Sequence, residues 1–305
     1  MTTTRILFGI GYLGGRVAKL WKADGDHTIA FTRRDDPTEI MIEARVFTGQ
    51  ADVTRPETLT CLNDFTKLCG TPVEAMLFAV GFDRTAGPDI HAVYADGLQN
   101  VLAALPTSVS RVVYISTTGV YGPAGGEWVD EQTPPDPQRE GGNASLAAEQ
   151  VLRRHPIGRR SVILRLAGIY GPGRVPYLDK LRAGEPLAVP SAGWLNLIHV
   201  DDAARIVVAA DQWAASQESD DGPHVFCVSD GVPAVRGDYY AEVARLIGAP
   251  PPTFCAPPAD SPAAARAASD RRVSNEKMSR LLGVELQYPS YREGLAAILA
   301  EKQAS

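Results

Sequence analysis

Short apolar runs alternate with amphipathic stretches along the first two-thirds of the chain. The runs are rich in β-branched residues and predict strands at 5–9, 28–32, 45–48, 74–79, 111–116 and 161–165. The stretches between them predict helices at 13–23, 56–68, 91–105 and 144–154. Residues 112–115 are apolar on both strand faces, as expected where helices cover both sides of a sheet. The pattern predicts an α/β protein with a Rossmann-type, doubly wound parallel sheet.

The regular alternation of predicted strands and helices ends after residue 165. Asp201 and Asp202 are expected as the N-cap and first-turn acid of a helix that runs to 215, followed by a strand at 225–228. Helices are predicted at 235–247, 274–282 and 291–301, and the Pro/Ala-rich stretch 249–268 is expected to be a surface loop. We expect a large domain of 1–165 plus about 198–224. A small C-terminal α/β substrate (lid) domain would take about 166–197 plus 225–305.

A glycine-rich run joins the first predicted strand to the first predicted helix. Gly9, Gly11 and Gly14 match the GxGxxG pattern, which is weak alone but has here the strand–turn–helix context of a dinucleotide site. The first glycine permits the tight turn, the second the close approach of a pyrophosphate, and the third close packing of helix on strand. The helix N-terminus offers N–H groups to the phosphates. We assign the run, including Tyr12 and Leu13, to a cofactor site.

The end of the second strand distinguishes NAD from NADP. An acidic residue there binds the ribose 2′-hydroxyl, whereas an arginine accommodates a 2′-phosphate. The strand ends at Thr32 and is followed at once by Arg33 and Arg34, with Asp35 and Asp36 one step further on. Because a planar guanidinium is suited to a phosphate, NADP is the predicted cofactor, and NAD remains the alternative.

Composition narrows the class of protein further. Hydrophobic residues make up 45% and charged residues 22%, which excludes disorder and collagen-like repeats. Acidic residues exceed basic ones, 36 against 30, and the net charge of −6 argues against nucleic-acid binding. No membrane span or secretory signal is recognisable, and the four cysteines form no zinc pattern. We expect a cytoplasmic protein that binds no metal, nucleic acid or membrane.

Further motifs follow the glycine run in order. They are Asp52-Val53, Ala79-Val80-Gly81, and the segments ISTTGVYG at 115–122, LRLAGIYGPG at 164–173 and NLIHVDD at 196–202. Together they resemble the extended short-chain dehydrogenase/reductase family, in its NAD(P)-dependent epimerase/dehydratase-like group. The resemblance implies that a small molecule is the substrate and that the chain forms a homodimer. It also implies that these residues contact the cofactor: Asp52, Val53, Ala79, Val80, Gly81 and Ser116.

The same resemblance locates the reaction centre. Registered on the VYG tripeptide, Thr117 takes the position of the family's Ser or Thr, which hydrogen-bonds the substrate oxygen. The family's Tyr and Lys, four residues apart, are missing, because Gly141 and Ser145 fall at their positions. We name Tyr121 as the candidate replacement acid/base, with Tyr170 and His199 as weaker ones.

Two functions remain open on this evidence. The first is an NADP-dependent oxidoreductase or epimerase-like enzyme with an atypical acid/base, and the retained Thr117 favours it. The second is a non-catalytic NADP(H)-binding redox sensor, favoured by the missing Tyr/Lys pair. Both require the glycine run to hold a dinucleotide.

Overall fold

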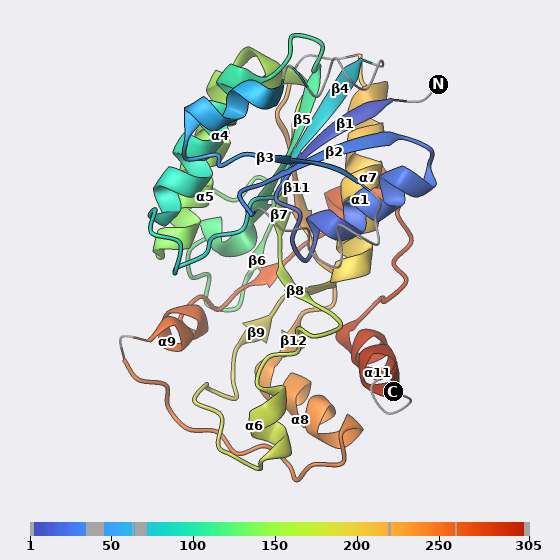
Figure 1. Cartoon of the computed structure of the whole chain (residues 1–305). Helices are drawn as coiled ribbons and strands as arrows, with labels where there is room; N and C mark the ends of the chain where they lie inside the picture. The colour runs from blue at the N-terminus through green and yellow to red at the C-terminus, as the bar shows by residue number, and fades with distance from the viewer. Residues whose placement is uncertain are drawn as a thin grey trace.

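A seven-stranded parallel sheet forms the centre of the molecule in the computed structural model, which describes residues 3–34, 46–62, 64, 72–218, 221–259 and 261–301. Its strand order is β11-β7-β5-β4-β1-β2-β3, and every pairing in it is parallel (Figure 1). The strands are β1 (Thr4–Phe8), β2 (His27–Thr32), β3 (Phe47–Gln50), β4 (Val73–Phe78), β5 (Arg111–Thr117), β7 (Val162–Leu166) and β11 (His224–Val228). This order confirms the Rossmann-type, doubly wound sheet.

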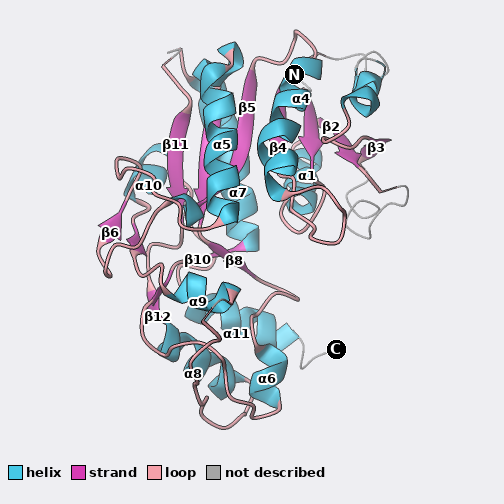
Figure 2. Ribbon diagram, turned by 90° about the vertical axis from the view of Figure 1, so that its left-hand side faces the viewer, coloured by secondary structure: helices cyan, strands magenta, loops and turns pink. Residues whose placement is uncertain are grey.

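Helices cover both faces of this sheet, which explains why its strands are apolar throughout (Figure 2). One face carries α1 (Gly14–Ala23), α7 (Val200–Ser216) and α10 (Glu276–Leu282). The other carries η1 (Pro56–Cys61), η2 (Ala92–Asp96), α4 (Gly97–Ala104) and α5 (Glu140–Arg154). Two short 3₁₀ turns, η3 (Thr118–Val120) and η4 (Pro156–Arg160), follow β5 and α5. The helix predicted at 91–105 is present, but it begins as a π-helical turn, η2.

A smaller group of elements lies beyond the carboxyl ends of the strands (Figure 1). It has its own buried cluster, in which aromatic residues such as Tyr170, Tyr239 and Tyr291 pack with leucines. Its helices are α6 (Leu178–Arg182), α8 (Arg236–Leu246), α9 (Pro262–Ala267) and α11 (Tyr291–Glu301). Three two-stranded pairings join β8 (Gly168–Tyr170) with β10 (Leu197–His199), β9 (Trp194–Leu195) with β12 (Ala234–Val235), and β6 (Trp128–Val129) with β13 (Arg272–Val273).

Three expectations need correction. The strand β11, which we expected in the smaller domain, is an edge strand of the large sheet, because its backbone pairs with β7. The expected surface loop 249–268 contains the helix α9, which begins at Pro262 and continues through alanines, residues that favour helix. The N-cap of α7 is His199 and not Asp201, since the His199 side chain accepts the Asp201 N–H. The division into two domains otherwise stays a prediction.

Candidate functional site

The glycine run forms the turn between β1 and α1. Gly9 has φ +93°, and a Cβ on it would lie 2.3 Å from the Ala79 carbonyl oxygen. A Cβ on Gly14 would lie 2.2 Å from the Gly9 carbonyl oxygen, so both positions exclude any side chain. At Gly11, by contrast, a Cβ would meet no described atom within 4 Å. The two outer glycines are therefore needed for packing, and the middle one leaves open space beside the helix N-terminus.

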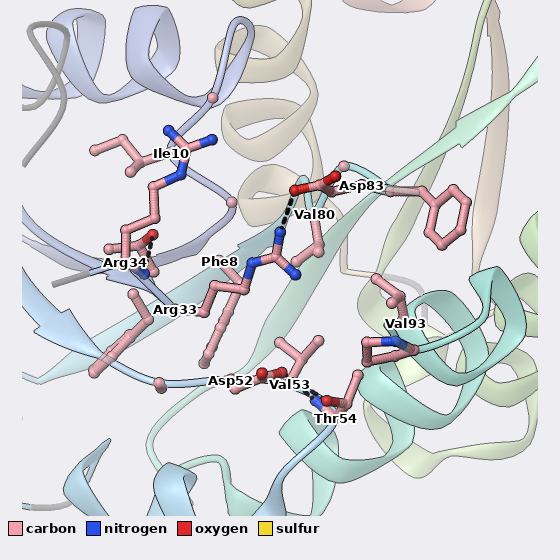
Figure 3. A pocket seen from close by; sticks show the side chains of 18 of the residues that line it. Phe8, Ile10, Arg33, Arg34, Asp52, Val53, Thr54, Val80, Asp83 and Val93 are labelled. Carbon is pink, nitrogen blue, oxygen red and sulfur yellow. Dashed lines mark hydrogen bonds and ion pairs between the residues drawn. The ribbon is translucent and has the colours of Figure 1, made fainter. Parts of the chain in front are cut away.

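A cavity of about 480 Å³ opens next to this turn, at the carboxyl ends of β1, β2, β3 and β4 (Figure 3). It lies at the crevice beside β1, where the order of connections in a doubly wound sheet reverses and where such folds bind ligands. Eight of the fifteen predicted site residues line it: Gly9, Gly11, Arg33, Arg34, Asp52, Val53, Val80 and Gly81. The other seven do not: Tyr12, Leu13, Gly14, Ala79, Ser116, Thr117 and Tyr121.

The wall of the cavity formed by Asp52 and Val53, at the bottom of the view in Figure 3, is held in place by hydrogen bonds. The Asp52 carboxylate accepts the backbone N–H and the hydroxyl of Thr54 at 2.9 and 2.8 Å. The Val53 carbonyl accepts the Asn100 side-chain amide at 2.9 Å, and a Cβ on Gly97 would come within 2.7 Å of the Val53 side chain. These contacts hold Val53 in place as part of the cavity lining.

Three arginines line the cavity, Arg33, Arg34 and Arg84, and the first two are the ones that the sequence predicted. Arg33 and Arg34 follow β2 directly, and Figure 3 shows the Arg33 side chain crossing the cavity toward Asp83. The Arg33 Nη2 lies 2.6 Å from the Asp83 Oδ2, and the two side chains are 38% and 42% exposed. Asp35 and Asp36, which follow the two arginines in sequence, lie outside the described residues. The arrangement offers a guanidinium to an anionic group at the mouth of the cavity.

Asp83 is a site residue that the sequence analysis missed. It lies five residues after the end of β4, just beyond the recognised Ala79-Val80-Gly81 turn. No motif in the sequence around Asp83 marked it as a site residue. Its carboxylate also accepts the N–H and hydroxyl of Thr85, at 2.9 and 2.7 Å. These hydrogen bonds, and then Arg33, lower the pKa of Asp83, which is therefore ionised.

The predicted catalytic residues lie away from this cavity, at the end of β5. Thr117 is half-buried, and its hydroxyl accepts the Gly119 N–H at 3.0 Å. The Ser116 hydroxyl, in contrast, is buried and donates to Glu149 at 2.7 Å, so it faces the interior and not a ligand. Thr117 thus keeps the partial exposure that contact with a substrate requires.

Tyr121 is buried, and its hydroxyl has protein partners. The hydroxyl donates to the Asp130 carbonyl at 2.6 Å and accepts from the Arg165 Nη1 at 2.8 Å. Burial raises its pKa further above the ordinary value, despite the opposing effect of Arg165. A buried hydroxyl with a raised pKa is poorly suited to proton exchange with a substrate. The structure therefore assigns Tyr121 a packing role, against our expectation.

The weaker candidates are buried as well. Tyr170 and His199 are each 1% exposed, and their rings meet edge to face at 5.3 Å. The Tyr170 hydroxyl reaches the Ser290 carbonyl at 3.3 Å, and His199 caps α7. At the position of the family's tyrosine, a Cβ on Gly141 would make an ordinary contact with the Ile90 side chain at 3.6 Å. Ser145, at the lysine position, is buried.

Two classes of feature are absent from the described part of the chain. None of its helices combines the length and the apolar character that crossing a membrane would require. Within the same residues, no group of three or more His, Cys, Asp or Glu is arranged to hold a metal ion.

Comparison with known proteins agrees with this geometry. The model of the NAD dependent epimerase/dehydratase family matches residues 6–226. Protein YeeZ of Escherichia coli is 32% identical over 207 residues, which cover 68% of this chain and 69% of YeeZ. A 3-diazoavenalumate denitrifying reductase from a Streptomyces species is 30% identical over 214 residues, covering 64% of this chain and 67% of the reductase. A structure of a functionally unknown conserved protein from Silicibacter pomeroyi covers 99% of this chain and all of its own, with TM-score 0.77 and 29% identity.

Proposed function

The chain belongs to the NAD dependent epimerase/dehydratase family, and from that membership we propose that it is an oxidoreductase or epimerase-like enzyme that uses NADP in preference to NAD. Its substrate would be a small molecule. The glycine turn and the adjoining cavity of about 480 Å³ fit the diphosphate and the adenosine half of such a cofactor. The proposal for NADP depends on one observation, the pair Arg33 and Arg34 lining that cavity at the end of β2.

The physical reason is the charge of the 2′-phosphate. A phosphate monoester carries close to two negative charges at neutral pH, and a guanidinium offers it several N–H donors in one plane. Arg33 and Arg34 face the same cavity, so both charges would act on a group bound there. NAD lacks this phosphate and would gain little from either side chain.

The protein's part in the chemistry is to bind and orient. The bound nicotinamide would supply hydride transfer, and the chain would place the substrate oxygen. Thr117 is the residue we propose for that contact, because its bond from Gly119 uses an acceptor lone pair and leaves the hydroxyl proton free to donate. Tyr121 is not proposed as the acid/base, since its hydroxyl is buried among Asp130 and Arg165.

A redox-sensor function stays a second candidate. The absence of the family's Tyr/Lys pair favours it, since Gly141 and Ser145 stand at those two positions. A sensor would bind the cofactor tightly without turning over a substrate. The streptomycete relative, by its name, is a reductase, which supports the enzyme instead.

Two measurements test the enzyme and the sensor proposals. Calorimetry measures the binding of NADPH and NADH, and NADPH absorbance then follows turnover of carbonyl and sugar-nucleotide substrates. Arg33→Ala should weaken NADPH binding by about 10- to 100-fold, since hydrogen bonds to charged groups contribute about 1.5–3 kcal/mol, and should change NADH binding by less than about threefold. Arg182→Ala is the matched control, because Arg182 is 47% exposed, carries a single ion pair and lies outside the cavity. Equal losses for both cofactors would refute the role of Arg33. Tight binding without turnover on any substrate would favour the sensor.

A further inference from the structure

Arg33 is the residue that would bind a 2′-phosphate, and its guanidinium is already paired with the carboxylate of Asp83. Its Nη2 lies 2.6 Å from the Asp83 Oδ2, across the mouth of the cavity (Figure 3). The two residues come from opposite walls, since Arg33 follows β2 and Asp83 follows β4, with β1 between those strands. The pair therefore spans the place where the ribose end of a dinucleotide would lie.

Asp83 is held in place by its own loop. Its Oδ1 accepts both the N–H and the hydroxyl of Thr85, which leaves Oδ2 directed at Arg33. A carboxylate fixed in this way cannot turn away without losing two hydrogen bonds. An incoming phosphate must therefore either share Arg33 with Asp83 or displace it, and in both cases it lies near a fixed negative charge.

The other charged residues that line the cavity form no described bond with Asp83. Asp52 also lines the cavity, but its carboxylate is turned to Thr54. Arg34 and Arg84 add positive charge without a described bond to Asp83. Asp83 is thus the acid that directly opposes the phosphate-reading arginine.

We infer that Asp83 is a specificity-determining residue that lowers affinity for 2′-phosphorylated cofactors and so narrows the preference for NADP over NAD. The inference rests on the proposed function, because it assumes that the cavity takes the adenosine half of a dinucleotide. Asp83 does not touch the reacting atoms. It acts by neutralising Arg33 and by repelling a second anion.

The charge is removed with little change of shape in Asp83→Asn. The amide oxygen of asparagine still accepts from Thr85. An exposed ion pair couples weakly, but a phosphate carries nearly two charges, so we expect affinity for 2′,5′-ADP and NADPH to rise about two- to tenfold. Affinity for 5′-AMP and NADH should change by less than about twofold. The gain should shrink at high ionic strength, because exposed charges are screened.

Asp179→Asn is the matched control. Asp179 is also an exposed aspartate paired with an arginine, Arg182, and it lies outside the cavity. It should leave every affinity unchanged. Urea unfolding of each variant checks that the fold is intact.

The outcomes separate the two proposals. The quantity that tests Asp83 is the change in the ratio of 2′,5′-ADP to 5′-AMP affinity between wild type and Asp83→Asn. If that ratio stays constant or falls, Asp83 only orients Arg33 or does nothing, and the inference is overturned. A wild type that prefers 5′-AMP, with the ratio still rising in the variant, refutes the NADP preference but supports the role of Asp83. Binding of neither nucleotide would overturn both.

Discussion

Glu149→Gln removes one charge from a buried ion pair that joins α5 to β7. The Glu149 carboxylate accepts Nε and Nη2 of Arg165 at 2.9 and 2.7 Å, and also the Ser116 hydroxyl at 2.7 Å. The Glu149 side chain is 0% exposed and that of Arg165 3%. Glutamine has nearly the same volume, but its amide would turn one N–H group toward donors. The variant thus leaves a buried guanidinium without its counter-ion.

Breaking such a pair costs about 3–5 kcal/mol, because the remaining charge stays out of water without compensation. The urea dependence of unfolding for a chain of this size is about 3 kcal/mol per M, so the midpoint should fall by roughly 1–1.7 M. The assay is urea unfolding followed by circular dichroism and by tryptophan fluorescence.

Two further variants make the result decisive. Asp179→Asn breaks a surface pair in which Asp179 is 97% exposed, and its midpoint should move by less than about 0.3 M. The double variant Glu149→Leu/Arg165→Met replaces the buried pair by apolar groups and should recover part of the loss. A midpoint for Glu149→Gln that matches the surface control would refute the reasoning.

The glycine turn and Asp230 give two more predictions. Gly14→Ala should lower the urea midpoint and abolish binding of both cofactors, since its Cβ would lie 2.2 Å from the Gly9 oxygen. Gly11→Ala should keep the midpoint, because its Cβ would meet no described atom within 4 Å. It should weaken NADPH and NADH binding alike, by about 5- to 100-fold. Calorimetry measures this, and wild-type affinity in Gly11→Ala would mean that the cofactor does not pass there. Burial raises the pKa of Asp230 to about 7, and its Oδ2 has no described hydrogen-bond partner. Because the unfolded carboxyl titrates near pH 4, the unfolded state loses its proton first, and wild-type stability falls as the pH rises through this window. Asp230→Asn should therefore gain on the order of 2–4 kcal/mol over wild type between about pH 4 and about pH 8. Urea midpoints across that range check this, and a difference that does not vary with pH would contradict it.

The central sheet and the glycine turn could be predicted from the sequence because local patterns determine them. Apolar runs without alternation occur where both faces of a strand are buried, and the seven-stranded sheet confirms that interpretation. Glycine is needed at positions 9 and 14 because a Cβ there would lie 2.3 and 2.2 Å from a backbone oxygen, so the constraint is visible directly in the residue type. Arg33 and Arg34 lie beside the cavity because they follow β2, and the carboxyl end of that strand lies at the ligand edge.

Contacts between segments distant in sequence were decided only by the tertiary structure. Tyr121 follows Thr117 by four residues, yet its hydroxyl turns inward to Arg165, which lies 44 residues away in sequence. Asp83 and Arg33 are 50 residues apart in sequence, and they form an ion pair because the order of strands in the sheet brings the ends of β2 and β4 close together. Whether a polar side chain faces a ligand or the interior depends on such partners, because a buried charge or hydroxyl requires compensation from whatever the fold puts beside it. The sequence alone therefore located the candidate cofactor site, because local patterns mark the glycine turn and the strand ends. The tertiary structure decided which polar side chains face the cavity and which are held by partners in the interior.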